Sequence, residues 1–297
     1  MKNSFIILGI GEILWDIFPD SRKLGGAPAN FAFHAHQLGA EAYPVSRIGA
    51  DFLGKEILET LKKLGLNRDL IQVDPAKPTG TVTVTIGADK KPSYMININT
   101  AWDFIDFDKK TAGKARQADA VCFGSLCQHS VKSRKTIIEI LRTTKHDCIK
   151  IFDINLRQKF YSKKNISLSL QLSDVLKLNE DELSVLADLY GIKGSQSATL
   201  RKIFYSFKSI RLIALTRGHN GSILSTPSHI AVHKGFSARV VDTVGAGDAF
   251  TAALAMGMLK GDPLETINEA ANRIGSFVCS RKGATPELPE NLRKIFG

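Results

Sequence analysis

The sequence predicts a three-layer α/β/α fold with a mostly parallel central sheet and a small second β-sheet that acts as a lid. Strand-like and helix-like segments alternate along most of the 297 residues, which is typical of a parallel sheet with helices on both faces. The alternation breaks at residues 79–98, where two runs rich in Thr and Val alternate with period two. The length suits one large domain, which we expect to span residues 1–297.

The alternating segments define the elements of the main sheet and its helices. We expect strands at residues 5–11, 42–48, 120–124, 148–153, 174–178, 210–216 and 239–241. We expect helices at residues 28–38, 52–64, 131–143, 180–189, 246–259 and 263–279. Ligands of such folds gather at the carboxyl ends of the parallel strands, so the loops after these strands are the expected place of a site.

The irregular region predicts a hairpin that stands apart from the main sheet. The run TGTVTVTI at 79–86 leads through a polar turn at 88–92 into a second alternating run at 93–98. A lone hairpin is only marginally stable, so it must pack on something. With residues 12–18 it would form a small sheet, and we expect this sheet to be a lid over a pocket or a dimer contact.

Composition narrows the class of protein. Hydrophobic residues make up 43% of the chain and charged residues 23%, and no apolar run approaches the roughly 18 residues of a membrane helix. The four cysteines have no CxxC spacing, which favours free thiols in a reducing, cytoplasmic setting over a metal site. The net charge is +11, but the Lys and Arg residues are spread along the chain. This favours a solvated basic surface that attracts nucleotides over nucleic-acid binding.

The segment DTVGAGDAF at residues 242–250 carries the strongest chemical signal. Gly245 and Gly247 let backbone N–H groups converge, and the helix that starts there adds partial positive charge, so the segment can form an anion hole. Asp248 in the first helical turn is placed to accept the proton of a hydroxyl that attacks a phosphate. The residues alone leave a second interpretation open, in which Gly-Ala-Gly-Asp is a tight entry to a helix.

A second segment imitates a phosphate loop and is excluded. Residues 49–56, GADFLGKE, nearly match the pattern GxxxxGK[ST], whose last position needs a hydroxyl for Mg²⁺. Glu56 stands there instead and would put an anion next to the phosphates. A helix that begins near Asp51 explains the segment.

Several motifs together resemble one family. DTVGAGDAF resembles the C-terminal signature DTxGAGDxF of the PfkB carbohydrate kinases of the ribokinase family, and LGGAPANFA at 24–32 resembles their N-terminal signature. GEILWDIFP at 11–19 and the run Ala101-Trp102-Asp103 are similar to fructokinase-like members. The resemblance covers residues 11–289. It implies a ribokinase-like fold and transfer of the γ-phosphate of ATP to a primary hydroxyl of a small-molecule sugar, with fructose to fructose 6-phosphate expected first.

The resemblance also implies roles for single residues. Asp248 would be the catalytic base, and the amides of Gly245, Ala246 and Gly247 would hold the charge that develops on the phosphoryl group. Asp16, Gly26 and Asn30 would bind sugar hydroxyls. Arg157, in a pattern FDINLR that includes Asp153 and Asn155, would offer its forked cation to phosphate or sugar.

The nucleotide and its ions are assigned in the same way. Asn179, Thr216, Gly218, Gly221 and Asn272 would bind ATP. Glu182, in the family's NxxE pattern with Asn179, would organise Mg²⁺ directly or through water. K⁺ would lie near Asp242, Val244 and residues 281–285. Taken alone, Asn179 indicates a helix cap and Asn272 an ordinary helical residue.

Other functions remain open at this stage. The same fold could act on ribose, 2-keto-3-deoxygluconate or a nucleoside, and no acidic residue stands around Asn97 and Asn99, where some fructokinase-like relatives carry one. A non-catalytic sugar-binding relative is a further alternative, although Asp248 and its glycines are intact. The resemblance suggests a homodimer formed through the lid, and neither a nucleic acid nor a membrane is an expected partner.

Overall fold

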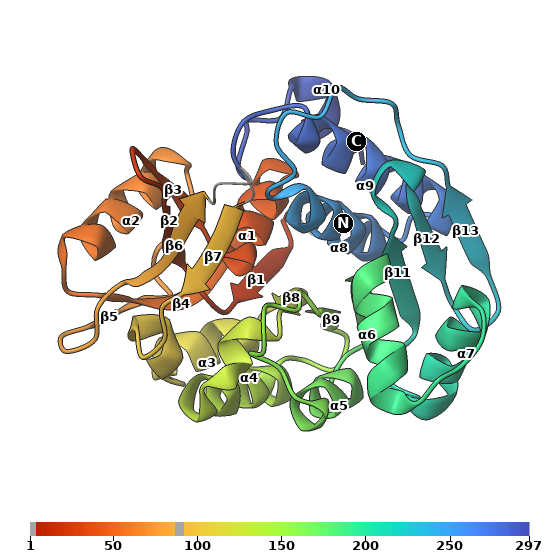
Figure 1. Cartoon of the computed structure of the whole chain (residues 1–297), viewed down its shortest axis with the longest axis horizontal. Coiled ribbons are helices and arrows are strands. Elements are labelled where there is room, and N and C mark those ends of the chain that lie inside the picture. The colour runs from red at the N-terminus through yellow and green to blue at the C-terminus, as the bar shows by residue number, and fades with distance from the viewer. Residues whose placement is uncertain (1–3, 87–91, 297) are drawn as a thin grey trace.

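The main sheet has nine strands in the order β13-β12-β11-β10-β9-β8-β1-β4-β5 (Figure 1). The computed structural model describes residues 4–86 and 92–296. Within this order, the seven neighbouring strands β11-β10-β9-β8-β1-β4-β5 pair in parallel. β12 and β13 add an antiparallel edge beside β11. Their bounds are β1 (Ile6–Ile10), β4 (Glu41–Gly49), β5 (Ile71–Asp74), β8 (Ala120–Phe123), β9 (Ile149–Asp153), β10 (Val175–Asn179), β11 (Leu212–Thr216), β12 (Ser222–Ser225) and β13 (Ile230–His233).

Helices cover both faces of this sheet, so the three-layer prediction is confirmed. One face is covered by α1 (Ala27–Gln37), α2 (Phe52–Lys63), α8 (Ala246–Lys260), α9 (Leu264–Cys279) and α10 (Glu290–Arg293). The other is covered by α3 (Lys109–Ala115), α4 (Val131–Thr143), α5 (Lys163–Gln171), α6 (Glu180–Tyr190) and α7 (Gln196–Ser206). Each face buries its own apolar cluster, which fixes the helices on the sheet.

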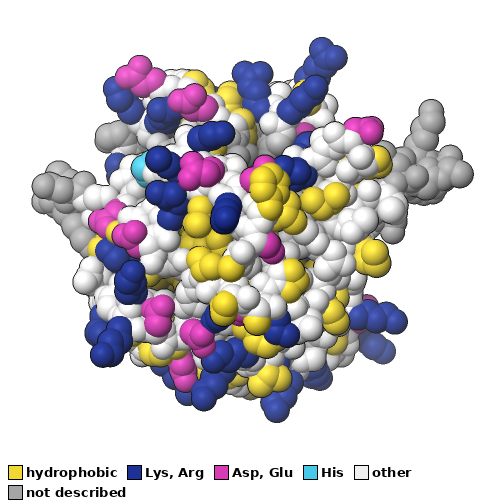
Figure 2. All heavy atoms as spheres, turned by 90° about the vertical axis from the view of Figure 1, so that its left-hand side faces the viewer, with side chains coloured by type: hydrophobic (Ala, Val, Ile, Leu, Met, Phe, Trp, Pro, Cys, Tyr) yellow, Lys and Arg dark blue, Asp and Glu magenta, His cyan; other side chains and the backbone are white. Residues whose placement is uncertain are grey.

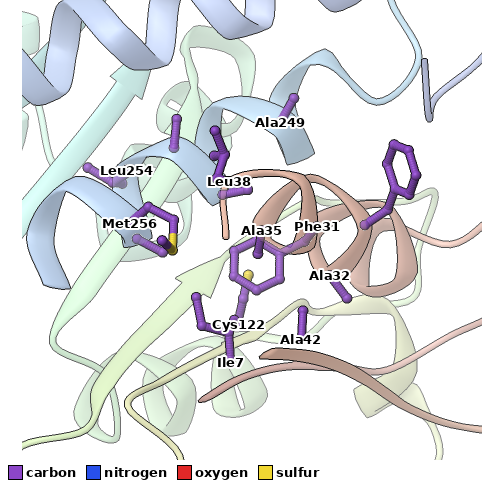
Figure 3. Close-up of a cluster of buried hydrophobic side chains, with 14 of the residues drawn as sticks. Ile7, Phe31, Ala32, Ala35, Leu38, Ala42, Cys122, Ala249, Leu254 and Met256 are labelled. Carbon is purple, nitrogen blue, oxygen red and sulfur yellow. The ribbon is translucent and has the colours of Figure 1, made fainter. Parts of the chain in front are cut away.

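The contact between α1 and α8 matters most for the site. Phe31 and Ala35 of α1 belong to the same buried cluster as Ile7 of β1 and Cys122 of β8 (Figure 3). Ala249 of α8 is part of that cluster and is fully buried. The packing therefore brings the N-terminal halves of two helices together, although they come from opposite ends of the chain.

The second sheet stands outside the main one, as predicted. Its strands β3 (Arg22–Gly25), β2 (Leu14–Ile17), β6 (Gly80–Ile86) and β7 (Pro92–Ile96) lie in that order. β2 and β6 pair in parallel and the other two pairs are antiparallel. Leu14, Val82 and Val84 form its small apolar cluster. Of the predicted turn at 88–92, residues 88–91 lie outside the described residues.

One predicted strand is wrong. Residues 239–241 belong to no strand, and residue 241 lies in a bend. The amides of Val241 and Asp242 donate to the carbonyl oxygen of Cys279, at 2.8 and 3.2 Å, so the segment satisfies the end of α9 instead of joining a sheet. Val241 is 49% exposed, which shows that its β-forming side chain found no core to enter. Several elements were not predicted from the sequence. They are β3, β5, β12, β13, α3, α5, α7 and α10.

The charged side chains and the cysteines are distributed as the sequence predicts. Figure 2 shows Lys and Arg side chains scattered over the face that it presents, interspersed with Asp and Glu, with no single basic patch. Cys122, Cys127 and Cys148 are buried free thiols and Cys279 is partly buried. Among the helices of the described residues, none has the length and apolar character needed to cross a membrane.

Candidate active site

Polar residues collect where the parallel strands end, opposite the start of α8. Asp153, Asn179 and Thr216 are the last residues of β9, β10 and β11, and Glu12 follows β1. A small cavity opens at this edge, and it is lined by Ala27, Pro28, Phe31, Cys122, Phe123, Gly124, Asp153, Asn155 and Asp248. This is the edge at which parallel α/β sheets bind their ligands.

Asn30 and Asp248 meet directly at this edge. Asn30 lies in the first turns of α1 and is 4% exposed, and its Nδ2 donates to Oδ2 of Asp248 over 2.9 Å. The buried Oδ1 of Asn30 has no hydrogen-bond partner among the described residues. An oxygen of this kind is costly unless a ligand donates to it, so it marks a place for a hydroxyl.

The environment of Asp248 sets its charge. The pKa of its carboxyl is raised to about 6, chiefly by burial and then by the negative charge of the nearby Asp153. The hydrogen bond from Asn30 and the cations Lys177 and Arg157 act in the opposite direction on this pKa. The residue as a whole is partly exposed, whereas its carboxyl group is buried. Asp248 is therefore a carboxylate near neutral pH with a proton affinity well above that of an ordinary Asp, which suits a general base.

The backbone at Gly245 requires glycine, and Gly247 is closely packed. Gly245 caps α8 with φ of 80°, and a Cβ there would lie 2.4 Å from the carbonyl oxygen of Ala284. A Cβ on Gly247 would lie 3.0 Å from Nζ of Lys177. No side chain caps α8, so its first amides can receive an anion, although the amide of Ala246 also makes a long contact of 3.4 Å with the carbonyl oxygen of Thr243.

Of the three residues predicted to bind sugar, Asn30 contacts Asp248 directly, whereas Gly26 and Asp16 lie near the start of α1. Gly26 has φ of 112°, and a Cβ there would lie 2.4 Å from the carbonyl oxygen of Glu12. Asp16 in β2 lies against the backbone of Gly25. Burial raises the pKa of Asp16, while Arg157 and Lys23 lower it.

Glu12 is a buried acid that the sequence did not single out. It is 3% exposed, and its Oε2 has no hydrogen-bond partner among the described residues. Burial raises its pKa to about 7, against the lowering effect of its own backbone amide and of Arg157. The signal that was missed is an acid directly after an apolar strand, at its carboxyl end.

The loop after β9 connects the second sheet to the site. Asn155 and Gln158 have positive φ angles of 39° and 47°, a conformation that non-glycine residues rarely adopt. Nε2 of Gln158 donates to the carbonyl oxygen of Tyr94 in β7 over 2.6 Å. Arg157 between them is exposed, and its charge lowers the pKa of Asp16, Glu12 and Asp248. Its guanidinium therefore lies near all three acids.

Asn179 and Glu182 form the cap of α6. Oδ1 of Asn179 accepts from the amide of Glu182, and Oε2 of Glu182 accepts from the amide of Asn179, each over 2.8 Å. The other carboxylate oxygen accepts from the amide of Leu156 over 3.0 Å. The helix-cap interpretation is thus confirmed. Because both oxygens already hold amides, the pair fits a metal ion that is held through water better than one that is bound directly.

The other residues predicted to bind ATP lie along β11, β12 and α9. Thr216 ends β11 opposite Asn179, and Gly218 and Gly221 shape the tight turn that follows, with φ of 55° and 78°. Asn272 is buried in α9, where its Nδ2 donates to Oγ of Ser222 over 2.6 Å and to the carbonyl oxygen of Asn268 over 2.7 Å. Its amide nitrogen is therefore committed to the protein.

The segment predicted to hold K⁺ is tied to a second loop. Asp242 accepts from the amides of Val244 and Gly283, at 3.1 and 3.0 Å, and lies 3.4 Å from Nζ of Lys23. Burial alone would raise the pKa of Asp242, but these partners outweigh it and lower the pKa. The structure thus brings Asp242, Val244 and residues 281–285 together.

Lys177 is the main residue of this region that sequence reasoning missed. It lies in the middle of β10 and is 8% exposed, and its Nζ lies 3.1 and 3.0 Å from the two carboxylate oxygens of Asp153. Oγ1 of Thr251 contacts the same carboxylate over 3.0 Å. The signal was a single charged residue inside the apolar strand VLKLN.

Comparison with known proteins places the chain in a family. Residues 20–291 match the pfkB family of carbohydrate kinases. An uncharacterized sugar kinase of Pyrococcus horikoshii is 30% identical over 97% of this chain and 95% of its own, and its structure in complex with ATP superimposes with a TM-score of 0.82, covering 98% and 100% of the two chains. Fructokinase-2 of Oryza sativa is 26% identical over 96% of this chain and 91% of its own. A double mutant of the Vibrio cholerae fructokinase, solved with fructose, ADP and a potassium ion, is 25% identical, with a TM-score of 0.81 and coverage of 99% and 98%.

The fold and these matches define a kinase with the ribokinase-like three-layer architecture. The chain belongs to the pfkB family of carbohydrate kinases and is a sugar kinase. The predicted fold and family are confirmed.

Proposed function

We propose that the chain transfers the γ-phosphate of ATP to a primary hydroxyl of a sugar, with fructose as the substrate and Asp248 as the base. The observation that carries this is the hydrogen bond of 2.9 Å between Asn30 and Asp248. It joins the helix predicted to bind sugar to the helix start predicted to bind phosphate.

In this reaction the sugar hydroxyl lies against the carboxylate of Asp248, beside the contact that Asp248 makes with Asn30. The hydroxyl donates its proton to Asp248 as its oxygen attacks the γ-phosphorus and the bond to the bridging oxygen of ADP breaks. The amides of Gly245, Ala246 and Gly247 stabilise the charge that develops on the transferring group, and Arg157 adds a cation from the facing loop. Asp16 and the free Oδ1 of Asn30 accept hydrogen bonds from other sugar hydroxyls.

The nucleotide would lie along the residues that follow β10 and β11. Thr216, Gly218 and Gly221 line its path, and Asn272 approaches the base from α9. Glu182 and Asn179 would hold a Mg²⁺ ion through water, and the ion would supply positive charge against the phosphates. A K⁺ ion beside Asp242 and Val244 would stabilise the loop that precedes the anion hole.

The second sheet would close over the sugar as a lid. The bond from Gln158 to Tyr94 links β7 to the loop that carries Arg157, so lid position and site are coupled. Closure would exclude water and suppress hydrolysis of ATP. Tyr94 and Met95 are exposed large apolar residues of β7, which supports a homodimer formed through this sheet.

Fructose is favoured by the relatives named above, which include fructokinases. The test is a panel of fructose, ribose, 2-keto-3-deoxygluconate and a nucleoside with MgATP, measured by ADP formation. We expect the highest kcat/KM with fructose. A higher kcat/KM with another member of the panel would refute fructose and leave the sugar kinase intact.

A further inference from the structure

Lys177 is a buried cation in the middle of the sheet, directly behind the anion hole. The register pairs it with Asp153 across β10 and β9, and its ammonium lies about equally close to both oxygens of that carboxylate, at 3.1 and 3.0 Å. Burying such a pair is expensive, and an apolar pair of the same size often serves stability as well or better. Stability alone therefore does not account for a lysine here.

The position of the ammonium indicates another use. A Cβ on Gly247 would lie 3.0 Å from Nζ, so the ammonium lies against the first turn of α8, whose amides would face the phosphate in the proposed reaction. Thr251 extends the contact, because its Oγ1 lies 3.0 Å from Oδ2 of Asp153 and 2.9 Å from the carbonyl oxygen of Gly247. These contacts hold the start of α8 against β9 and β10, through Asp153, Lys177 and Thr251.

The charges around Asp248 show what the lysine counteracts. Asp153 and Lys177 face Asp248 from β9 and β10, Arg157 from the loop after β9, and Glu12 from the loop after β1. Neutral Asn30 and the Cys122 thiol complete its surroundings. Burial alone would lower the pKa of Lys177, but Asp153, Glu182 and Asp248 outweigh it and raise the pKa, so the ammonium stays charged.

Resting on the proposed function, we propose that Lys177 is a positioning residue for phosphoryl transfer: it neutralises Asp153 and holds the first turn of α8, so that Asp248 meets the sugar hydroxyl as a carboxylate. Lys177 acts through Asp153 and the helix start and need not touch the substrate. Without it, the negative charge of Asp153 would act on Asp248 uncompensated, and Asp248 would hold its proton at higher pH.

The test is a double-mutant cycle of Lys177→Met, Asp153→Asn and the double variant. Lys150→Met on β9 is the matched control. The readout is the titration midpoint of the Asp248 carboxyl, followed by ¹³C NMR of protein labelled at aspartate and assigned with Asp248→Asn. We expect the midpoint to rise by about one unit in Lys177→Met, as is typical of a lost neighbouring charge, and to fall in Asp153→Asn. The double variant should return near or below the wild-type midpoint, and the control should not move it.

Kinetics give the second readout. If the titration midpoint of Asp248 rises by about one unit in Lys177→Met, its kcat/KM should be about fivefold below wild type at pH 6 and nearly equal to wild type at pH 8.5. An unmoved Asp248 midpoint, with kcat/KM lowered equally at both pH values, would show a merely structural ion pair and overturn the proposal. If Lys177→Met does not fold, the Asp248 midpoint in Asp153→Asn tests the proposal instead. A lower midpoint than in wild type would support the proposal, and an unchanged midpoint would overturn it. If no sugar is phosphorylated, the proposed function fails while the NMR midpoints still test the charge relationship.

Discussion

Asn30 and Asp248 are 218 residues apart in the chain, and a hydrogen bond of 2.9 Å joins their side chains. The bond runs from a buried amide in α1 to the carboxylate at the start of α8. It fixes where the proposed base lies relative to the proposed sugar site, and it leaves Oδ1 of Asn30 available for a hydroxyl.

Replacing Asn30 should therefore damage catalysis. Asn30→Ala removes a hydrogen bond to a charged group, a contact worth about 1.5–3 kcal/mol, so kcat/KM for the sugar should fall roughly 10- to 100-fold. His36→Ala on the exposed side of the same helix is the control and should leave kcat/KM unchanged. Steady-state kinetics with the preferred sugar measure both, and an Asn30→Ala enzyme with wild-type kcat/KM would contradict the assigned contact.

The pH dependence of the reaction should report Asp248. Its pKa is raised to about 6, chiefly by burial, and only the ionised form can accept a proton. We expect kcat/KM to be constant above about pH 7 and to fall tenfold per unit well below pH 6. An acid limb near pH 4, the usual range of an exposed Asp, would mean that another environment governs the base.

Glu12 should weaken the fold at alkaline pH. Burial raises its pKa from 4.5 to about 7, so the folded state binds a proton between these values that the unfolded state has released. Stability therefore falls as pH rises through this window, and it is highest below about pH 4.5 as far as this group is concerned. Glu12→Gln, which keeps the shape without the charge, should gain about 3 kcal/mol of unfolding free energy at pH 8 relative to its effect at pH 4.

Urea titrations of wild type and Glu12→Gln at the two pH values measure this difference. Glu59→Gln, at an exposed position of α2, is the comparison variant. Equal effects of Glu12→Gln at pH 4 and pH 8 would show that folding leaves the pKa of Glu12 unchanged, and would contradict the prediction.

The sequence predicted the elements with strong patterns and the family signatures. Alternation located the hairpin that became β6 and β7, and the glycines of DTVGAGDAF predicted a helix start with open amides, which Gly245 provides. Asn179 and Glu182 show that a helix-cap interpretation and a family motif can describe the same residues.

Other features depend on tertiary context that no local pattern contains. Lys177 follows two apolar residues in β10, and nothing in VLKLN shows that Asp153 will lie beside it. In the sequence, Glu12 is only an acid that follows a strand. Its burial depends on the elements that pack around it in the fold. Residues 239–241 have strand-forming side chains, but no sheet edge was available to pair with them.

The central claim is that Asp248 is the base of a sugar kinase, and the rate of ADP formation by Asp248→Asn tests it most directly. The introduced amide oxygen can still accept from Asn30, so sugar affinity, measured by calorimetry, should be kept. Turnover at saturating sugar and MgATP should fall by a factor of about 10² or more, in line with the contribution of a general base. Turnover near the wild-type value, with sugar affinity intact, would contradict the claim.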